Sequence, residues 1–129
     1  IWAGHGGGCT PLHYDATNNF FCQLQGRKQV LLFAPSQSFK LYPHHHRHPK
    51  NNFSIADVEQ PDLEKLPALR HARGVETTME PGDVLWIPSY YWHYVRQLDD
   101  TLNLSLNFWF GGSPESCKRC GFYSQHQQA

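Results

Sequence analysis

Hydrophobic and polar residues alternate along several short segments of this chain, which is the pattern of half-buried β-strands. In the clearest case, residues 102–110, the leucines and phenylalanines at even positions share one face, and Asn103, Ser105, Asn107 and Trp109 share the other. Similar runs predict strands at 18–25, 28–33, 76–79, 83–87 and 93–97. Short strands with hardly any helix are typical of an all-β sandwich or barrel.

Turn residues and one long irregular segment divide these strands. Gly26-Arg27 predicts a hairpin between 18–25 and 28–33, and Glu80-Pro-Gly-Asp83 predicts a second turn. Residues 34–75 are rich in proline and have no long hydrophobic period, so we expect an insertion with at most one helical turn, at Asp62–Leu66. We therefore expect one domain over 1–112 and a polar, loosely held tail over 113–129.

Composition narrows the function classes. The 129 residues are 40% hydrophobic and 14% aromatic, which indicates one folded domain. Eleven basic and eleven acidic residues balance, so the sequence carries no electrostatic signature of nucleic acid or membrane binding. The chain begins with Ile1 rather than Met, so it can be a piece of a longer protein. An oligomer is expected only if flanking segments supply the contacts.

Two groups of potential metal ligands favour plain interpretations. Cys117 and Cys120 form a lone CxxC in a polar tail, and a structural zinc site needs four ligands. Together with Cys9 and Cys22 they indicate free thiols, as expected of a cytoplasmic or also nuclear protein. The run His44-His45-His46-Arg47-His48 lies between prolines, and we expect a solvated loop rather than a ligand set.

A third group points to chemistry. His13 and Asp15 are two residues apart, so on a strand they share one face. His93 follows the Pro81-Gly-Asp83 turn and a short apolar strand. Two histidines and one carboxylate with open positions form the facial triad of non-haem Fe(II) oxygenases. The plain alternative is a surface His/Asp pair with an unrelated His93 at the edge of the core.

Lys28 shares a strand face with Val30 and Leu32, which directs a cation to the apolar side. A buried ammonium needs an anion. Polar and aromatic residues also project together from two other strands: Asn19, Phe21 and Gln23 from one, Asn107 and Trp109 from the other. We interpret these faces as the lining of a cavity; the alternative is a solvent-exposed face.

Several motifs are spread over residues 8–112: His13-Tyr-Asp15, Asn19-Phe-Phe, Gly26-Arg-Lys28, Leu41-Tyr-Pro, Gln60-Pro-Asp, Pro81-Gly-Asp-Val-Leu-Trp-Ile-Pro88, His93 and Asn107-Phe-Trp109. Together these motifs resemble JmjC-type 2-oxoglutarate oxygenases, most closely the asparaginyl hydroxylase that inhibits hypoxia-inducible factor. The resemblance implies a double-stranded β-helix fold and hydroxylation of a protein side chain by O2, with release of succinate and CO2.

The same resemblance implies roles for individual residues. Fe(II) would be held by His13, Asp15 and His93. 2-Oxoglutarate would be anchored by Lys28 and Thr10, with Asn19 and Asn107 as further contacts, and Trp109 would line the substrate side.

The chain departs from this family member at four positions on the substrate side. Asn52 and Phe53 replace a pair that holds the target amide, and Ala16 and Thr17 are smaller than the residues that follow the triad Asp there. Asparagine is therefore one candidate target among several. The alternatives are a lysine demethylase, an RNA-modifying hydroxylase of the same family, a cupin-like metal enzyme without 2-oxoglutarate, and a catalytically silent binding domain. The expected partner is a protein or peptide substrate.

Overall fold

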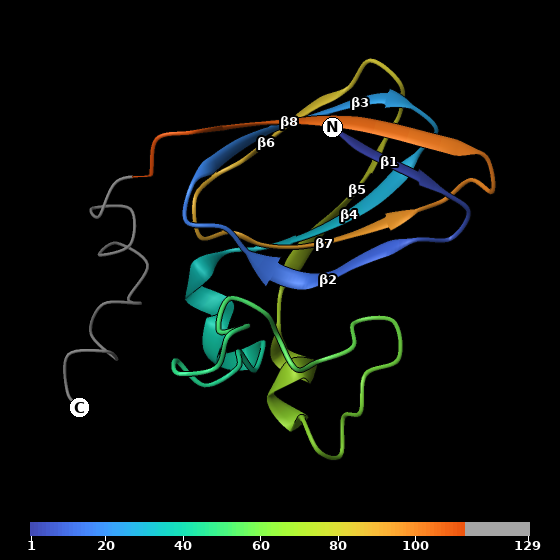
Figure 1. Ribbon diagram of the computed structural model, residues 1–129. Helices are drawn as coiled ribbons and strands as arrows, with labels where there is room; N and C mark the ends of the chain where they lie inside the picture. The colour runs from blue at the N-terminus through green and yellow to red at the C-terminus, as the bar shows by residue number, and fades with distance from the viewer. Residues whose placement is uncertain (113–129) are drawn as a thin grey trace.

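Two four-stranded antiparallel sheets face each other in the computed structural model, which describes residues 1–112 (Figure 1). The first sheet has the order β1 (Trp2–His5), β8 (Leu102–Phe110), β3 (Asn18–Gln25) and β6 (Val84–Ile87). The second has the order β2 (Cys9–Tyr14), β7 (Trp92–Gln97), β4 (Lys28–Phe33) and β5 (Gly74–Met79). This arrangement confirms the predicted all-β, double-stranded β-helix fold.

The alternation along β8 is confirmed, and its polar side faces inward. Asn103 and Ser105 are fully buried, whereas Leu102 and Phe108 on the other face are 42% and 57% exposed. Buried amides need partners, and Gln23 supplies one: its Nε2 donates to Asn103 Oδ1 at 2.9 Å and to two backbone carbonyls. This network closes one end of the barrel. Nearer the middle, Phe21, Val30, Met79 and Ile87 form an apolar cluster between the sheets.

The prediction of a hairpin at Gly26-Arg27 is wrong, although a turn is present. β3 and β4 flank the turn but belong to different sheets and do not pair. The Arg27 carbonyl accepts hydrogen bonds from Leu98 N and Asn103 Nδ2, both at 3.0 Å, and the Arg27 side chain pairs with Asp99 at 2.9 Å. These contacts with the β7–β8 region turn the chain from one sheet to the other.

Several element boundaries also differ from the prediction. β1 had no predicted counterpart; β5 starts at Gly74 and β7 at Trp92, slightly earlier than expected, and β6 starts at Val84. Within the insertion, Leu66 N donates to Asp62 O at 2.9 Å, as expected of a helical turn at that place. Two short 3-10 helices were not predicted: η1 (Pro35–Lys40) and η2 (Pro67–His71), each with Pro at its start.

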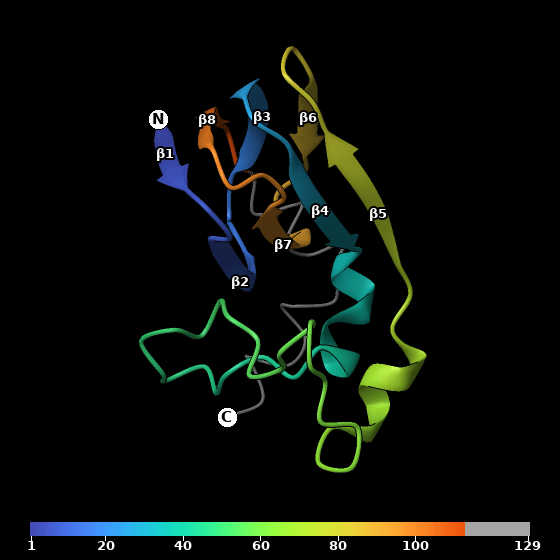
Figure 2. The same ribbon diagram turned by 90° about the vertical axis from the view of Figure 1, so that its right-hand side faces the viewer.

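The insertion between β4 and β5 lies against the outer face of the second sheet (Figure 2). Leu41 is fully buried there against Leu12, Trp92 and Tyr94. Trp92 Nε1 also donates to Ser38 Oγ at 2.8 Å. Both faces of this sheet are therefore covered, which fixes the strands that carry the candidate site.

Neither helix within residues 1–112 is long and apolar enough to cross a membrane. The expectations for the polar tail and for Cys117 and Cys120 concern residues outside the described part of the chain.

Candidate metal and cosubstrate site

Three potential metal ligands converge at one end of the space between the sheets. His13 lies on β2 and His93 on β7, where the two residues are directly paired. Asp15 follows β2 by one residue, and alternation brings its side chain to the same side as His13. The β2–β7 register shifts between Thr10 and His13, an irregularity of the kind often found beside active sites.

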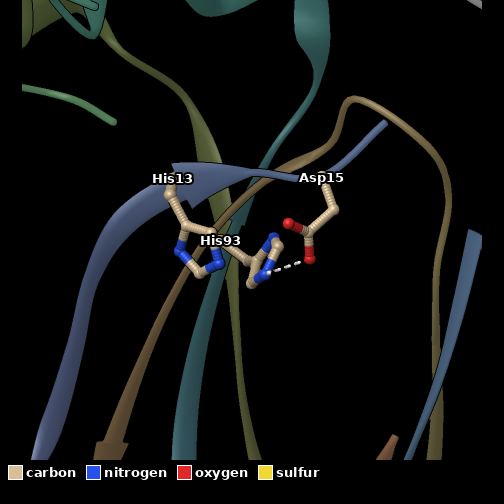
Figure 3. Close-up of side chains that lie close together, drawn as sticks. All are labelled: His13, Asp15 and His93. Carbon is tan, nitrogen blue, oxygen red and sulfur yellow. Dashed lines mark ion pairs between the residues drawn. The ribbon is translucent and has the colours of Figure 1, made fainter. Parts of the chain in front are cut away.

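The ligand atoms of these three side chains all lie within 4.8 Å of one another (Figure 3). His93 Nε2 is 3.8 Å from Asp15 Oδ2, and the two imidazole centroids are 4.1 Å apart. Each histidine places Nδ1 near a backbone carbonyl: His13 near Pro11 O at 2.9 Å, and His93 near Tyr91 O at 3.0 Å. With the proton on Nδ1, both Nε2 atoms are free to bind a metal.

The electrostatics of His93 agree with that arrangement. Burial, together with the neighbouring His13, lowers the pKa of His93 to about 4. The imidazole is therefore neutral near pH 7, which is the form that binds metals. Two imidazoles and one carboxylate suit a divalent transition metal such as Fe(II), so the residues present fit the ion that the sequence predicted.

A second centre lies deeper in the barrel. Lys28 is 5% exposed, its Nζ donates to Ser105 Oγ at 2.7 Å and lies 5.1 Å from the Phe21 ring centroid. No ion pair joins it to a carboxylate within residues 1–112. Burial lowers the pKa of this ammonium. The inward orientation predicted from alternation is confirmed, and the Lys28 site lacks an anion.

One cavity of about 350 Å³ connects the two centres. Its lining includes all three candidate ligands together with Thr10, Asn19, Lys28 and Asn107, the residues expected to contact 2-oxoglutarate. Among the described residues, three buried amide oxygens in this lining have no hydrogen-bond partner: those of Asn19, Gln97 and Asn107. An ammonium without a carboxylate partner inside a cavity fits an anionic ligand such as a dicarboxylate, and the amide oxygens show that the cavity wall is polar.

Three of the expected substrate-side residues are at the cavity: Asn52, Phe53 and Trp109. The Phe53 ring stacks on His13 with centroids 5.0 Å apart and an interplanar angle of 16°. Asn52 is held by β2, because its Nδ2 donates to Tyr14 O at 3.0 Å and its own carbonyl accepts from Tyr14 N.

Ala16 and Thr17, also expected on the substrate side, are not in the cavity lining. The chain turns after Asp15, whose carbonyl accepts from Tyr90 N at 2.7 Å, and the Ala16 carbonyl faces Gly112 instead. The structure therefore gives no support to a substrate role for these two residues.

With this geometry, comparison with known proteins becomes decisive. The sequence profile of the cupin-like domain family matches residues 1–116. This chain belongs to the cupin-like domain family. It is 42% identical to JmjC domain-containing protein D of Dictyostelium discoideum, over 80% of this chain and 23% of that protein. It is 43% identical to lysine-specific demethylase 8 of Danio rerio, over 84% of this chain and 26% of that protein.

A third relative of this cupin-like domain is HSPB1-associated protein 1 of Bos taurus, 39% identical over 84% of the chain. The chain spans about a quarter of the length of the curated relatives it matches. The first two names agree with the predicted JmjC family, and none of the three names an asparaginyl hydroxylase.

Solved structures agree on the fold. The cupin domain of Drosophila melanogaster CENP-C superposes with a TM-score of 0.52 at 8% identity, covering 84% of this chain and 56% of that one. Escherichia coli ycfD gives a TM-score of 0.51 at 20% identity, covering 98% of this chain and 29% of that one. At these identities the likeness concerns the fold alone.

Sequence reasoning missed two cavity-side polar residues of the cupin-like domain. Ser105 bonds Lys28, and it stands two positions before Asn107 on the same face of β8, so the alternation could have indicated it. Gln97 lies directly opposite Lys28 in the β4–β7 pair, and no local pattern reveals that register.

The remaining histidines and cysteines form no second metal cluster within residues 1–112. The His44–His48 run lies in a turn-rich loop, and Cys9 and Cys22 are free thiols.

Proposed function

We propose that this domain is the catalytic part of an Fe(II)- and 2-oxoglutarate-dependent oxygenase that hydroxylates a protein side chain. One observation carries the proposal: a His/Asp/His triad shares one cavity with a buried lysine that has a hydrogen bond to Ser105 but no carboxylate partner among the described residues. The triad alone would suit many cupin-like metal enzymes. The inward cation adds a reason to expect an anionic cosubstrate.

The proposed roles follow from the positions of the side chains. His13, Asp15 and His93 would hold the metal, and the Nδ1 contacts of the two imidazoles keep their Nε2 atoms available. Lys28, with Thr10 beside the same cavity, would bind the remote carboxylate of 2-oxoglutarate. The bound iron and cosubstrate would supply the oxidising power, transferring one oxygen atom of O2 to the substrate and the other to succinate as CO2 is released.

The walls of the cavity would limit access of water to the reacting centre. Phe53 covers one side of His13, and Trp109 stands at the outer end of β8 on the inward-facing side. Asn19 and Asn107 line the same cavity, and their amide N–H groups would donate to oxygens of the cosubstrate.

A second candidate is oxidation of N-methyl-lysine, a reaction of the same class that releases formaldehyde. The name lysine-specific demethylase 8 of one relative favours testing it. A cytoplasmic or nuclear location would suit either protein substrate.

The experiment is to incubate the full-length protein with Fe(II), 2-oxoglutarate and matched peptides that carry Asn, Asp, His, Leu, Lys or methyl-lysine at the target position. Succinate is quantified, and mass spectrometry records a gain of one oxygen or loss of a methyl group. Asp15→Ala should abolish both signals. Asp62→Ala is the matched control, because it removes an exposed carboxylate that is paired with Lys65, and this variant should retain both signals. Full iron-dependent turnover by Asp15→Ala would refute the assignment.

A further inference from the structure

Part of the insertion forms a finger at the mouth of the cavity, which we define as residues 43–54. Its two ends pair with each other: His44 N donates to Phe53 O at 2.9 Å, and Pro43 and Ser54 form a β-bridge. Figure 2 shows this part of the chain, coloured teal to green, extending away from the barrel below β2.

The returning end of the finger is attached to the strand that carries the metal ligands. Tyr14 N donates to Asn52 O at 3.0 Å, Ser54 N donates to Leu12 O at 2.9 Å, and His13 and Phe53 form a β-bridge. The finger therefore has a fixed position relative to His13, so any group on it has a fixed position relative to the site.

The finger also carries positive charge without an internal counter-charge. From Leu41 to Ala56 the sequence contains four histidines, Arg47 and Lys50 and not one acidic residue. Arg47 and Lys50 are exposed, and neither forms an ion pair with a residue of the described chain.

Lys50 connects this charge to the site. Its Nζ lies 6.0 Å from the Phe53 ring centroid, and that ring stacks on the candidate ligand His13. The Lys50 backbone is held on both sides, since its N donates to His48 Nδ1 at 3.0 Å and its carbonyl accepts from Phe53 N at 2.9 Å. An ammonium is thus held one aromatic ring away from a ligand of the metal site.

The histidine run has a local role in this arrangement. His48 Nδ1 accepts from Lys50 N, His45 Nδ1 accepts from Arg47 N at 3.3 Å, and the rings of His44 and His48 stack with centroids 4.3 Å apart. Imidazoles that accept these bonds shape the turns and hold the backbone of the two cationic residues.

We propose that the tip of the finger, through Lys50 and Arg47, binds an acidic side chain adjacent to the target residue of a protein substrate. The inference rests on the proposed function for the identity of the reaction, and it assigns a substrate class: peptides with Asp or Glu next to the modified residue. A protein segment is favoured over nucleic acid because two exposed cations on one short loop are few for the many phosphate contacts that nucleic-acid binding uses.

The test measures affinity rather than turnover. Peptides identical except for Glu, Gln or Lys beside the target residue are titrated into the full-length protein with Zn(II) and 2-oxoglutarate. The Glu peptide should bind about two- to fivefold more tightly than the Gln peptide, as expected for an exposed ion pair, and the Lys peptide more weakly still. The difference should shrink as the salt concentration rises from about 0.05 to about 0.5 M.

Charge reversal supplies the decisive comparison. Lys50→Glu should abolish or invert the preference for the Glu peptide, whereas Arg70→Glu, the same charge change at an exposed position of η2 outside the cavity lining, should leave it intact. Equal affinity for the Glu and Lys peptides, or equal effects of the two variants, would overturn the proposal.

Further outcomes distinguish the acidic-peptide site from a nucleic-acid site and from the proposed oxygenase activity. Displacement of the Glu peptide by a mixed-sequence RNA oligonucleotide, in a manner sensitive to Lys50→Glu, would replace the acidic peptide by nucleic acid as the partner. Succinate formation without any charge preference would refute the finger's role alone. A charge preference without succinate formation would refute the proposed oxygenase and leave the acidic-peptide site standing.

Discussion

Replacing Lys28 by Met separates two effects of this residue: its effect on the free energy of unfolding and its contribution to binding 2-oxoglutarate. The side chain is 5% exposed, with one hydrogen bond, to Ser105, and no carboxylate paired with it in residues 1–112. Met has a similar length and retains the contact with Phe21. The variant therefore removes the charge and leaves most of the packing.

The two effects on stability oppose each other. Loss of a hydrogen bond from a charged donor costs about 1.5–3 kcal/mol, whereas removal of a desolvated ammonium relieves several kcal/mol. We expect Lys28→Met to raise the free energy of unfolding of the ligand-free protein by about 1–2 kcal/mol. Urea denaturation with metal but without 2-oxoglutarate measures this difference.

The same variant should bind 2-oxoglutarate poorly. Loss of one charge-assisted contact of about 1.5–3 kcal/mol weakens affinity roughly 10- to 150-fold. At a concentration 100 times the wild-type Kd, the ligand stabilises the wild type by about 2.7 kcal/mol, but a variant with a hundredfold weaker Kd by only about 0.4 kcal/mol. The order of stability should thus reverse on adding 2-oxoglutarate. A variant that is less stable without ligand and equally stabilised by it would show that Lys28 is a structural residue, and the reasoning would fail.

Three other predictions concern charge and metal. Burial lowers the pKa of Lys28, and a bound anion would raise it again. The affinity of the wild type for 2-oxoglutarate should therefore fall as the pH rises toward the ordinary lysine pKa of 10.5. Calorimetry can test this, and a Lys28→Arg variant that still binds should show no such fall. Asp15→Ala should weaken Fe(II) binding at least tenfold by equilibrium dialysis with unchanged far-UV circular dichroism; unchanged affinity would exclude Asp15 as a ligand. Tyr94→Phe removes the part-buried hydrogen bond to Glu59 and should lower the free energy of unfolding by about 1–3 kcal/mol. Arg96→Ala removes only an exposed ion pair to the same Glu59 and should lower it by less than about 1 kcal/mol; equal losses would contradict this account.

The local sequence pattern predicted the strands whose two faces have different surroundings. In such a strand one face points to solvent or into the cavity, and the other packs against apolar side chains. The alternation over Leu102–Phe110 indicated both the bounds of β8 and the inward side of Asn107. The His13/Asp15 spacing and the orientation of Lys28 followed from the same two-residue period. Each of these inferences used residues that are neighbours in sequence.

The hairpin error and the missed residue Gln97 arose where contacts between residues far apart in the sequence determine the structure. Gly26-Arg27 has the composition of a hairpin turn, but Asp99 and Asn103 hold Arg27 and direct β4 into the other sheet. Gln97 lies opposite Lys28 only because β7 pairs with β4 in that register. None of these long-range contacts leaves a periodic signal.

The polar interior of the barrel links these observations to function. At the closed end, the Gln23 amide nitrogen donates to three acceptors, although its Oε1 has no partner among the described residues. In the cavity, Lys28 has one neutral partner and the amide oxygens of Asn19 and Asn107 have none among the described residues. A fold selected for stability alone would fill such a space with apolar side chains, because unpaired buried polar groups are costly. Three of the four unpartnered amide oxygens of the described residues, those of Asn19, Gln97 and Asn107, line the cavity that also contains His13 and His93, and the fourth belongs to Gln23. The Lys28 ammonium, which has no carboxylate partner in this cavity, is therefore best explained by an anionic ligand that binds it next to a metal.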